Sequence, residues 1–515
     1  MKNKKFYIAT PIYYASGNLH IGHVYTTTLA RVIANYKKLD GYEVKMLTGS
    51  DEHGQKIEQK AKEANLDPQV FVDQLVQKYL DLWKLYDIKF DYYQRTTNQS
   101  HKTAIQHIFS KFLQDGYIYK GKYEGLYSVS DEEFLTETQA VFKDGKYYHP
   151  QSNHELILVS EESYFFKMNQ FAEWLIDYIN QHPSFLAPQK LINEMMNNFL
   201  LKGLEDLSVT RTNINWGIKT LEDPNHTVYV WLDALCNYIS ALGYDPNKAV
   251  LADDFNAFWN DENAEVVHLI GKEIARFHMI YWPIFLKALD LRLPTRIQSH
   301  GWIVTPTGKM SKSKGNVVDP VLLLEKYHPE MVKYYLSSQI ILGEDGVYDE
   351  DRLIDLVNAD LINNFGNLVS RTLKMKSNTF ETTAYKVSDY ALDQEIDQKI
   401  IQSVEAYKSH FDRFEVDKAL KIAINLSSEL NKYIDETQPW TLKEDLERLE
   451  LIIARLLNGI YAVATYLSVV LEQKMQEVLQ ALNIEAFSFN LISNFGKFDN
   501  IKQANQFMLF QRIKK

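Results

Sequence analysis

Apolar positions in the first part of the chain form short unbroken runs with helical segments between them. Runs at residues 6–9 and 44–47 flank residues 21–38, where apolar positions recur with helical spacing. The α/β pattern resumes with the apolar run 266–270, and again with the segment 296–299. Unbroken runs indicate strands buried on both faces, and strands separated by helices indicate parallel pairing. The pattern therefore predicts an α/β fold with a Rossmann-like, doubly wound parallel sheet.

Beyond about residue 349 the pattern becomes almost wholly helical. Apolar residues recur at intervals of three and four from Ile396 to Phe414 and from Ala419 to Tyr433. This spacing predicts an antiparallel helical bundle. The apolar segment 451–471 contains Arg455 and other polar residues that are unfavourable in hydrocarbon, so we expect a buried bundle helix and not a membrane span.

The segment from about 115 to 220 matches neither pattern. It is rich in aromatic residues, glycine and turn-forming residues, and this is typical of an insertion between two halves of a sheet domain. We therefore expect five segments: the first half of the Rossmann-like sheet domain at 1–115, an inserted connective domain at 116–225, the second half of the sheet domain at 226–295, a region with a lysine-rich loop at 296–350, and an all-α domain at 351–515.

Composition and charge narrow the class of protein. A chain of 515 residues with 45% hydrophobic and 24% charged residues is globular and long enough for two to four domains. A single cysteine, Cys236, excludes intramolecular disulfides and any multi-cysteine zinc site, so we predict a cytoplasmic location. A net charge of -11 argues against a surface built for nonspecific nucleic-acid binding, so any RNA contact must be local.

The first chemical motif lies where the first predicted strand has ended and the first helix begins. His20 and His23 stand one turn apart with Gly22 between them. Helix N-terminal amides attract phosphate, a glycine permits close approach, and two imidazoles can donate hydrogen bonds to phosphoryl oxygens. Two alternatives stay open: the histidines only cap the helix, or they form a metal pair with Asp51 or His53.

The second motif is a polar, lysine-rich loop at 309–316. It contains Lys309, Lys312 and Lys314 beside serines and glycines. Such an array of cations suits the charge that builds on a departing pyrophosphate. The alternative is an ordinary solvated basic loop.

The two motifs together resemble the signatures of the class I aminoacyl-tRNA synthetases. These are His20-Ile21-Gly22-His23 and Lys309-Met310-Ser311-Lys312-Ser313. Segments 10–14, 49–54, 230–234, 271–283 and 300–302 narrow the resemblance to the methionyl-tRNA synthetase family, over essentially the whole chain. The resemblance implies a ligase that activates L-methionine with ATP to methionyl-adenylate. It then transfers methionine to the 3′ end of initiator and elongator methionine tRNA for translation.

The resemblance also implies roles for individual residues in the reaction with ATP. His20, His23, Lys309 and Lys312 would be catalytic, and Mg²⁺ carried by ATP would bridge the phosphates. Residues that bind ATP would be His20, Gly22, His23, Gly271, Glu273, His300, Val304, Lys309 and Lys312. Glu273 follows a strand end, where it can accept hydrogen bonds from ribose hydroxyls; the alternative is an exposed helix-cap carboxylate.

Methionine and the anticodon are assigned in the same way. Asp51 would bind the methionine ammonium, and the pocket would be lined by Ile12, Tyr14, Trp231, Ala234, Leu235, Tyr238, Ile274, His278 and Trp282. For each aromatic residue alone, core packing is the default. In the helical domain, Asn367, Arg371 and Trp440 would read the anticodon, because an aromatic ring can stack on an unpaired base. Without the resemblance, Trp440 would be interpreted as a buried core residue.

The chain departs from the family's pattern in three places. Ser128 and Asp131 stand where many relatives have one cysteine pair of a zinc-binding knuckle, and His149 and His154 alone cannot complete a structural zinc site. We predict a zinc-free insertion held by packing. Leu235 and Asn237 replace a proline and a glycine common in relatives. The chain ends soon after residue 513, where some relatives continue into a dimerising domain, so we expect a monomer.

Three rival hypotheses remain, one within the synthetases and two from other classes of protein. The first is another synthetase specificity, where the chain's length disfavours leucyl, isoleucyl and valyl enzymes and the lone cysteine disfavours a cysteinyl enzyme. The second is a small-metabolite nucleotidylyltransferase, which would lack the long helical domain. The third is a noncatalytic RNA-binding or scaffold protein. Exchange of pyrophosphate into ATP that depends on methionine alone separates all three from the assignment above.

Overall fold

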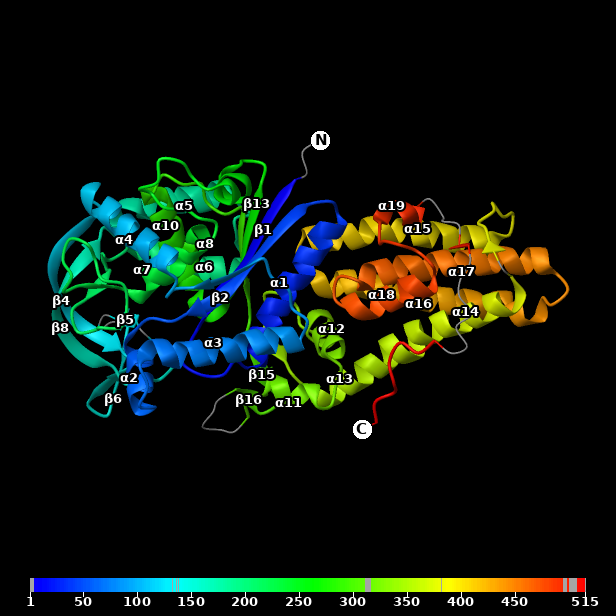
Figure 1. Cartoon of the computed structure of the whole chain (residues 1–515), viewed down its shortest axis with the longest axis horizontal. Helices are drawn as coiled ribbons and strands as arrows, with labels where there is room; N and C mark the ends of the chain where they lie inside the picture. The colour runs from blue at the N-terminus through cyan, green and yellow to red at the C-terminus, as the bar shows by residue number, and fades with distance from the viewer. Residues whose placement is uncertain are drawn as a thin grey trace. The chain divides into compact units, whose positions relative to one another are not determined.

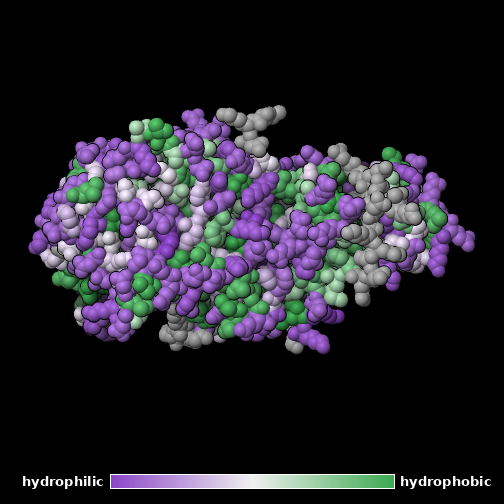
Figure 2. Space-filling model, viewed as in Figure 1, coloured by the Kyte–Doolittle hydropathy of each residue, from purple (hydrophilic) through white to green (hydrophobic). Residues whose placement is uncertain are grey.

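The structure is a computed structural model that describes residues 4–131, 133–135, 137, 139–310, 316–380, 382–493, 498–499 and 507–514. The chain packs as two compact units (Figure 1). The sheet unit comprises Met1–Leu19, Val44–Lys84 and Lys89–His300. The helical unit comprises His20–Glu43, Leu85–Ile88 and Gly301–Lys515. On the face drawn in Figure 2, hydrophilic residues dominate and hydrophobic residues form small scattered groups.

A six-stranded sheet forms the centre of the sheet unit, in the order β3-β2-β1-β13-β14-β9. The strands are β1 (Lys5–Tyr14), β2 (Glu43–Asp51), β3 (Tyr92–Arg95), β9 (Leu186–Ala187), β13 (Glu265–Gly271) and β14 (Arg296–His300). β1 pairs with β13, β13 with β14, and β2 with β3 in parallel. Because β1 and β13 are buried almost throughout, both faces of the sheet are covered, which explains the unbroken apolar runs. The predicted doubly wound parallel sheet is confirmed.

The strand order reverses between β1 and β13. From β1 the sheet continues outward through β2 and β3, and the later strands β13 and β14 lie on the other side of β1. In open parallel sheets the carboxyl ends of the strands at such a reversal are the usual ligand site. Ile12 and Tyr14 lie at this end of β1, and Asp51 ends β2.

A second, antiparallel sheet occupies the range expected for the insertion, in the order β10-β8-β4-β5. It is built on the long pair β4 (Ile118–Ser128) and β8 (Ile157–Phe166), with β5 (Glu133–Leu135) and β10 (Leu207–Ser208). The hairpin of β6 (Val141–Lys143) and β7 (Lys146–Tyr148) forms a separate two-stranded sheet. At the base of the β4–β8 sheet, Phe166 packs edge-to-face on Phe112 at 5.0 Å and on Phe285 at 5.1 Å. The base of this sheet therefore belongs to the same hydrophobic core as the parallel sheet.

The helical unit contains a bundle of long helices that lie side by side in Figure 1. They are α14 (Asn367–Thr379), α15 (Ala391–Asp412), α16 (Val416–Thr437) and α17 (Leu446–Leu467), followed by the shorter α18 (Glu472–Ala481) and α19 (Phe489–Ser493). α17 is long and apolar enough to cross a membrane, but most of it is buried within the bundle. Its Arg455 Nη2 lies 2.9 Å from Asp397 Oδ2 of α15, so the buried charge is paired. The predicted buried bundle helix is confirmed.

Helix α1 (Ile21–Leu39) follows β1 in the chain but packs with the helical unit. Tyr36 stacks on Phe411 of α15 at 4.3 Å, and Asn35 Nδ2 donates to the carbonyl of Val469 at 3.0 Å. A small sheet of β16 (Gly308–Lys309), β15 (Ile303–Thr305) and β17 (Gly346–Val347) completes this unit, with α11 (Pro320–Leu324), α12 (Pro329–Gln339) and α13 (Glu350–Leu356). The bundle and the first chemical motif therefore share one compact unit.

Candidate active site

The two motif histidines build the first turn of α1 through a reciprocal cap. The backbone N–H of Gly22 donates to His20 Nδ1 at 3.1 Å, and the backbone N–H of His20 donates to His23 Nδ1 at 2.9 Å. Because each Nδ1 accepts a hydrogen bond, the proton of each neutral ring is on Nε2. The ring centroids are 4.0 Å apart, so two Nε2–H donors lie close together at a helix N-terminus. The two histidines can therefore cap the helix through Nδ1 and still donate to a phosphate from Nε2.

Gly22 is required for this arrangement. A Cβ at position 22 would lie 2.9 Å from Cε1 of His20 and 3.0 Å from its Nδ1. Such contacts are shorter than van der Waals packing permits, so a larger residue would displace the His20 ring. Glycine at position 22 therefore leaves room for the His20 ring that caps the helix, in addition to its predicted role of giving a nucleotide access.

Both flanks of the lysine-rich loop are fixed within the helical unit. On one side, the backbone of Lys309 pairs with Val304 in the β15–β16 hairpin. On the other, Asn316 Nδ2 donates to Thr305 Oγ1 at 3.2 Å, and the carbonyl of Val318 accepts from Ile21 N at 3.3 Å. Lys312 itself lies outside the described residues. Residues 309 and 316 thus both contact β15, and residue 318 contacts the start of α1.

The predicted ATP residues of the sheet unit meet at the carboxyl ends of two neighbouring strands. Gly271 ends β13 and is in register with His300, which ends β14. Glu273 follows in the first turn after β13, and its carboxylate folds back so far that a Cβ on Gly271 would lie 2.5 Å from Oε1. Glu273 is exposed. Val304 belongs to the helical unit.

Four of the predicted methionine residues form one aromatic cluster in the sheet unit. Trp231 in α7 (Val230–Leu235) lies edge-on to His278 at 6.3 Å. Tyr238, in α8 (Asn237–Ser240), packs at 5.8 Å from Trp282. The Tyr238 hydroxyl lies 2.7 Å from His278 Nε2. Tyr238, His278 and Trp282 are fully buried, whereas Trp231 is half-buried and forms the accessible edge of the cluster.

The remaining pocket candidates belong to the same compact unit as this cluster. Ile12 and Asp51 are buried on neighbouring strands, and the carbonyl of Asp51 accepts from Ala15 N at 2.8 Å, directly after Tyr14. Ala234 and Leu235 are buried on α7. Ile274 touches the cluster through its carbonyl oxygen, which lies 2.9 Å from His278 Nδ1.

The polar groups of Tyr238, His278 and Trp282 are neutral and paired, whereas Nε1 of Trp231 is buried without a hydrogen-bond partner among the described residues. Burial lowers the pKa of His278 to about 4, and its hydrogen bond to the Ile274 carbonyl only partly offsets this effect. His278 therefore donates from Nδ1 to that carbonyl, and its Nε2 accepts the Tyr238 proton. Burial also raises the pKa of Tyr238 and lowers that of His268, which accepts from Trp282 Nε1 at 3.1 Å. An uncharged cluster of this kind suits a mainly apolar ligand that carries a weakly polar atom.

The anticodon candidates lie on one side of the bundle. Asn367 is exposed at the start of α14, and Arg371 one turn later places Nη2 3.4 Å from Asp435 Oδ1 on α16. α16 ends at Gln438, whose φ of 43° reverses the chain before the short turn that carries Trp440. Trp440 is 50% exposed, so the interpretation as a buried core residue is wrong. A cavity of about 450 Å³ opens beside Asn367, lined also by Ser370 and residues 507–510.

Comparison with known proteins identifies the family. The family described as tRNA synthetases class I (M) matches residues 6–145 and 149–373, and the anticodon binding domain of methionyl tRNA ligase matches residues 384–511. The chain is 50% identical to the methionine–tRNA ligase of Mycoplasmopsis pulmonis, over 99% of both chains. It is 43% identical to that of Bacillus subtilis, over 99% of this chain and 78% of the relative. The chain belongs to the methionine–tRNA ligase family.

A solved structure of the same family agrees with this assignment. The methionyl-tRNA synthetase of Mycobacterium tuberculosis, in complex with methionyl-adenylate, superposes with a TM-score of 0.93 at 31% identity, covering 99% of this chain and 100% of the other. The chain is a class I ligase that activates methionine and charges tRNA. The three rival hypotheses are therefore excluded.

Sequence reasoning missed several residues that contact the predicted ones. Phe277 stacks face to face on Trp231 with ring centroids 3.6 Å apart. Glu52, next to Asp51, is fully buried and accepts from Arg95 at 2.7 and 2.8 Å. Asp233 accepts from two histidines, and one of them, His53, was considered only as a metal ligand. The charged run 51–53 after an apolar strand was the available signal, because charges there need partners.

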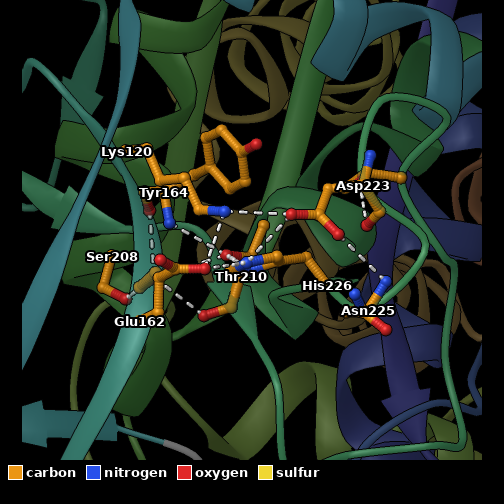
Figure 3. Close-up of polar contacts among 10 residues, drawn as sticks. Lys120, Glu162, Tyr164, Ser208, Thr210, Asp223, Asn225 and His226 are labelled. Atoms are coloured by element: carbon orange, nitrogen blue, oxygen red, sulfur yellow. Dashed lines mark hydrogen bonds and ion pairs between the residues drawn. The ribbon is translucent and has the colours of Figure 1, made fainter.

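One group of side chains in the described part of the chain has a geometry that a metal ion could use. Ligand atoms of Glu162, Asp223 and His226 lie within 4.8 Å of one another. Figure 3 shows that the ammonium of Lys120 already lies between the carboxylates, 2.6 Å from Glu162 and 3.0 Å from Asp223. His226 Nδ1 contacts Thr210 Oγ1 at 2.9 Å. The lysine is thus the cation of this group, and no histidine considered earlier as a metal ligand belongs to it.

Proposed function

We propose that His20, His23, Lys309 and Lys312 stabilise the transition state of methionine activation. A methionine carboxylate oxygen attacks the α-phosphorus of ATP in line, and the bond to pyrophosphate breaks, so the leaving group takes the electron pair. This step needs positioning and charge stabilisation and no protein nucleophile. The two neighbouring Nε2–H groups at the start of α1 carry the proposal, because they can donate to the α-phosphoryl oxygens while the lysines balance the charge on pyrophosphate.

ATP would be bound through the strand ends and the small hairpin. Gly22 and Gly271 give the nucleotide access to the backbone, Glu273 accepts hydrogen bonds from the ribose hydroxyls, and His300 and Val304 complete the contacts. The exposed carboxylate of Glu273 over the end of β13 supports its role. Mg²⁺ would be held mainly by phosphate oxygens and water, since it prefers octahedral oxygen ligands and keeps part of its hydration shell.

Methionine would bind with its ammonium on Asp51 and its side chain against the aromatic cluster. The neutral, buried Tyr238–His278 pair beside Trp231 and Trp282 offers apolar walls and a weak polar group for the sulfur. Ile12, Tyr14, Ala234, Leu235 and Ile274 would complete the pocket. One methylene of mismatch is worth roughly 1–3 kcal/mol, so the pocket discriminates against smaller aliphatic amino acids to a limited degree.

Asn367, Arg371 and Trp440 would read the anticodon shared by initiator and elongator methionine tRNA. A tryptophan that is 50% exposed on a chain reversal is available to stack on an unpaired base. The segment limits predicted from the sequence stand as the proposed domains, with the tRNA stem contacted by 296–350. We further propose a cytoplasmic monomer.

The insertion would be zinc-free. At the position of the relatives' zinc knuckle, Asp131 accepts from Ser128 at 2.5 Å and from Ser152 at 2.7 Å, and His154 Nδ1 lies 3.0 Å away. These hydrogen bonds join the two turns that a metal would otherwise hold. Burial alone would raise the pKa of Asp131, but these partners hold it below its ordinary value.

The experiment that tests the proposed function is exchange of labelled pyrophosphate into ATP with single amino acids. Methionine should drive exchange, and leucine or valine at equal concentration should drive it far more weakly. Charging of methionine tRNA should follow in the complete reaction. Equal exchange with leucine, or none with any amino acid, would overturn the proposal.

A further inference from the structure

We propose that Asp233, held between His53 and His101, is a positioning residue that fixes the distance between the proposed ammonium site and the proposed side-chain pocket for methionine. The inference rests on the proposed function of Asp51 and Trp231. Asp233 Oδ2 lies 2.7 Å from His53 Nδ1, and Oδ1 lies 2.6 Å from His101 Nε2. All three side chains are buried, and Asp233 is only 1% exposed.

Each partner belongs to a different element of the sheet unit. His53 follows Asp51 by two residues at the end of β2, and Asp233 lies on α7 between Trp231 and Ala234. His101 belongs to α4 (Gln99–Gln114), which packs in the hydrophobic core. One carboxylate thus joins the strand end that carries Asp51 to the helix that carries Trp231, and ties both to a rigid helix.

The buried carboxylate of Asp233 depends on hydrogen bonds from both histidines. His101 donates from Nε2 to Asp233, and its other ring nitrogen, Nδ1, lies 2.7 Å from Ser240 Oγ. His53 donates from Nδ1 to the other oxygen. Burial alone would raise the pKa of Asp233, but the two histidines hold it below its ordinary value, so it stays a carboxylate with both oxygens paired. Loss of either partner would leave a buried charge underpaired, which is strongly unfavourable.

The backbone around His53 is held from the opposite side as well. Trp216 Nε1 donates to the carbonyl of Glu52 at 2.5 Å, and the carbonyl of Trp216 accepts from Gly54 N at 3.2 Å. With residues 52 and 54 fixed by Trp216, the His53–Asp233 bond sets where α7 lies against this segment. Asp51 lies two residues before His53, and Trp231 lies two residues before Asp233. Loss of the bond should therefore change methionine binding more than ATP binding.

The test compares two substitutions of equal size at His53. Asn places an amide N–H close to the position of Nδ1–H and keeps the donor, whereas Leu has the same shape without it. In methionine-dependent pyrophosphate exchange, His53→Leu should raise KM for methionine about tenfold, equivalent to about 1.4 kcal/mol, with KM for ATP within about twofold. His53→Asn should stay within about threefold of the wild type for both substrates.

Two controls make the result decisive. His107→Leu removes a half-buried His–Asp contact of similar length, 2.8 Å to Asp245, elsewhere on α4, and should leave both KM values unchanged. Asp51→Asn should raise KM for methionine if the proposed ammonium site is correct. If Asp51→Asn has no effect, the proposed function of Asp51 fails; if it acts but His53→Leu does not, the positioning role alone fails.

A second variant at position 53 still tests the proposal if the His53→Leu protein does not fold. Where His53→Leu does not fold, His53→Gln moves the amide about one bond farther from the Nδ1 position and provides the same comparison with His53→Asn. Equal KM values for the Gln and Asn variants, or parallel changes in methionine and ATP KM for any folded variant, would overturn the inference.

Discussion

Arg31 of α1 forms a two-point ion pair with Glu472 in the first turn of α18. Its Nε lies 3.1 Å from one carboxylate oxygen and its Nη2 2.5 Å from the other, and both side chains are largely buried. Burial alone would raise the pKa of Glu472, but Arg31 holds it below its ordinary value. The helix that begins with His20 and His23 is thereby anchored on the bundle that carries the proposed anticodon residues.

Removing this anchor should destabilise the helical unit. Glu472→Gln removes the negative charge that forms the two-point pair with buried Arg31, and we expect the free energy of unfolding to fall by about 3 kcal/mol in urea denaturation. The control is Glu436→Gln, which breaks an exposed pair with Lys432 and should change stability by less than about 0.5 kcal/mol. Equal effects of the two substitutions would show that the Arg31 pair has no structural role beyond that of a surface contact.

Neutral His278 should make stability depend on pH. Its pKa in the folded protein is about 4, below the ordinary 6.5, so the unfolded chain binds a proton that the folded protein does not. The free energy of unfolding is therefore not reduced by this group above about pH 6.5. It falls as the pH drops toward about 4, by up to about 1.4 kcal/mol per pH unit. His278→Gln should flatten the slope of unfolding free energy in that window. An unchanged slope would contradict a neutral, buried His278.

Trp440→Ala should separate tRNA charging from methionine activation. Base stacking is worth about 1–3 kcal/mol, so kcat/KM for tRNA should fall by about tenfold to a hundredfold. Pyrophosphate exchange without tRNA should keep its wild-type rate, and stability should change little because half of the ring is already in solvent. Leu446→Ala, at a neighbouring position of similar exposure, is the matched control. Unaltered charging in Trp440→Ala would remove the stacking role.

Sequence reasoning predicted the elements well because their causes are local. Short, mainly apolar runs predicted β1, β2 and β13, and intervals of three and four predicted the bundle helices. It did not reveal the junction at Asp233, because His53, His101 and Asp233 are far apart in the chain and each alone is an ordinary polar residue. Nor does any local pattern show that α1 packs with helices several hundred residues later, as Tyr36 does on Phe411. Such relationships depend on tertiary packing.

The central claim is that the start of α1 acts chemically on ATP in addition to capping its own helix. His23→Asn separates the two roles, because the Asn carbonyl oxygen can accept the His20 N–H as Nδ1 does, while the Nε2–H donor is lost. The measurement is the single-turnover rate of methionyl-adenylate formation by the folded variant. The account predicts a fall of at least about a hundredfold with an unchanged melting temperature and methionine affinity; a wild-type rate would contradict it.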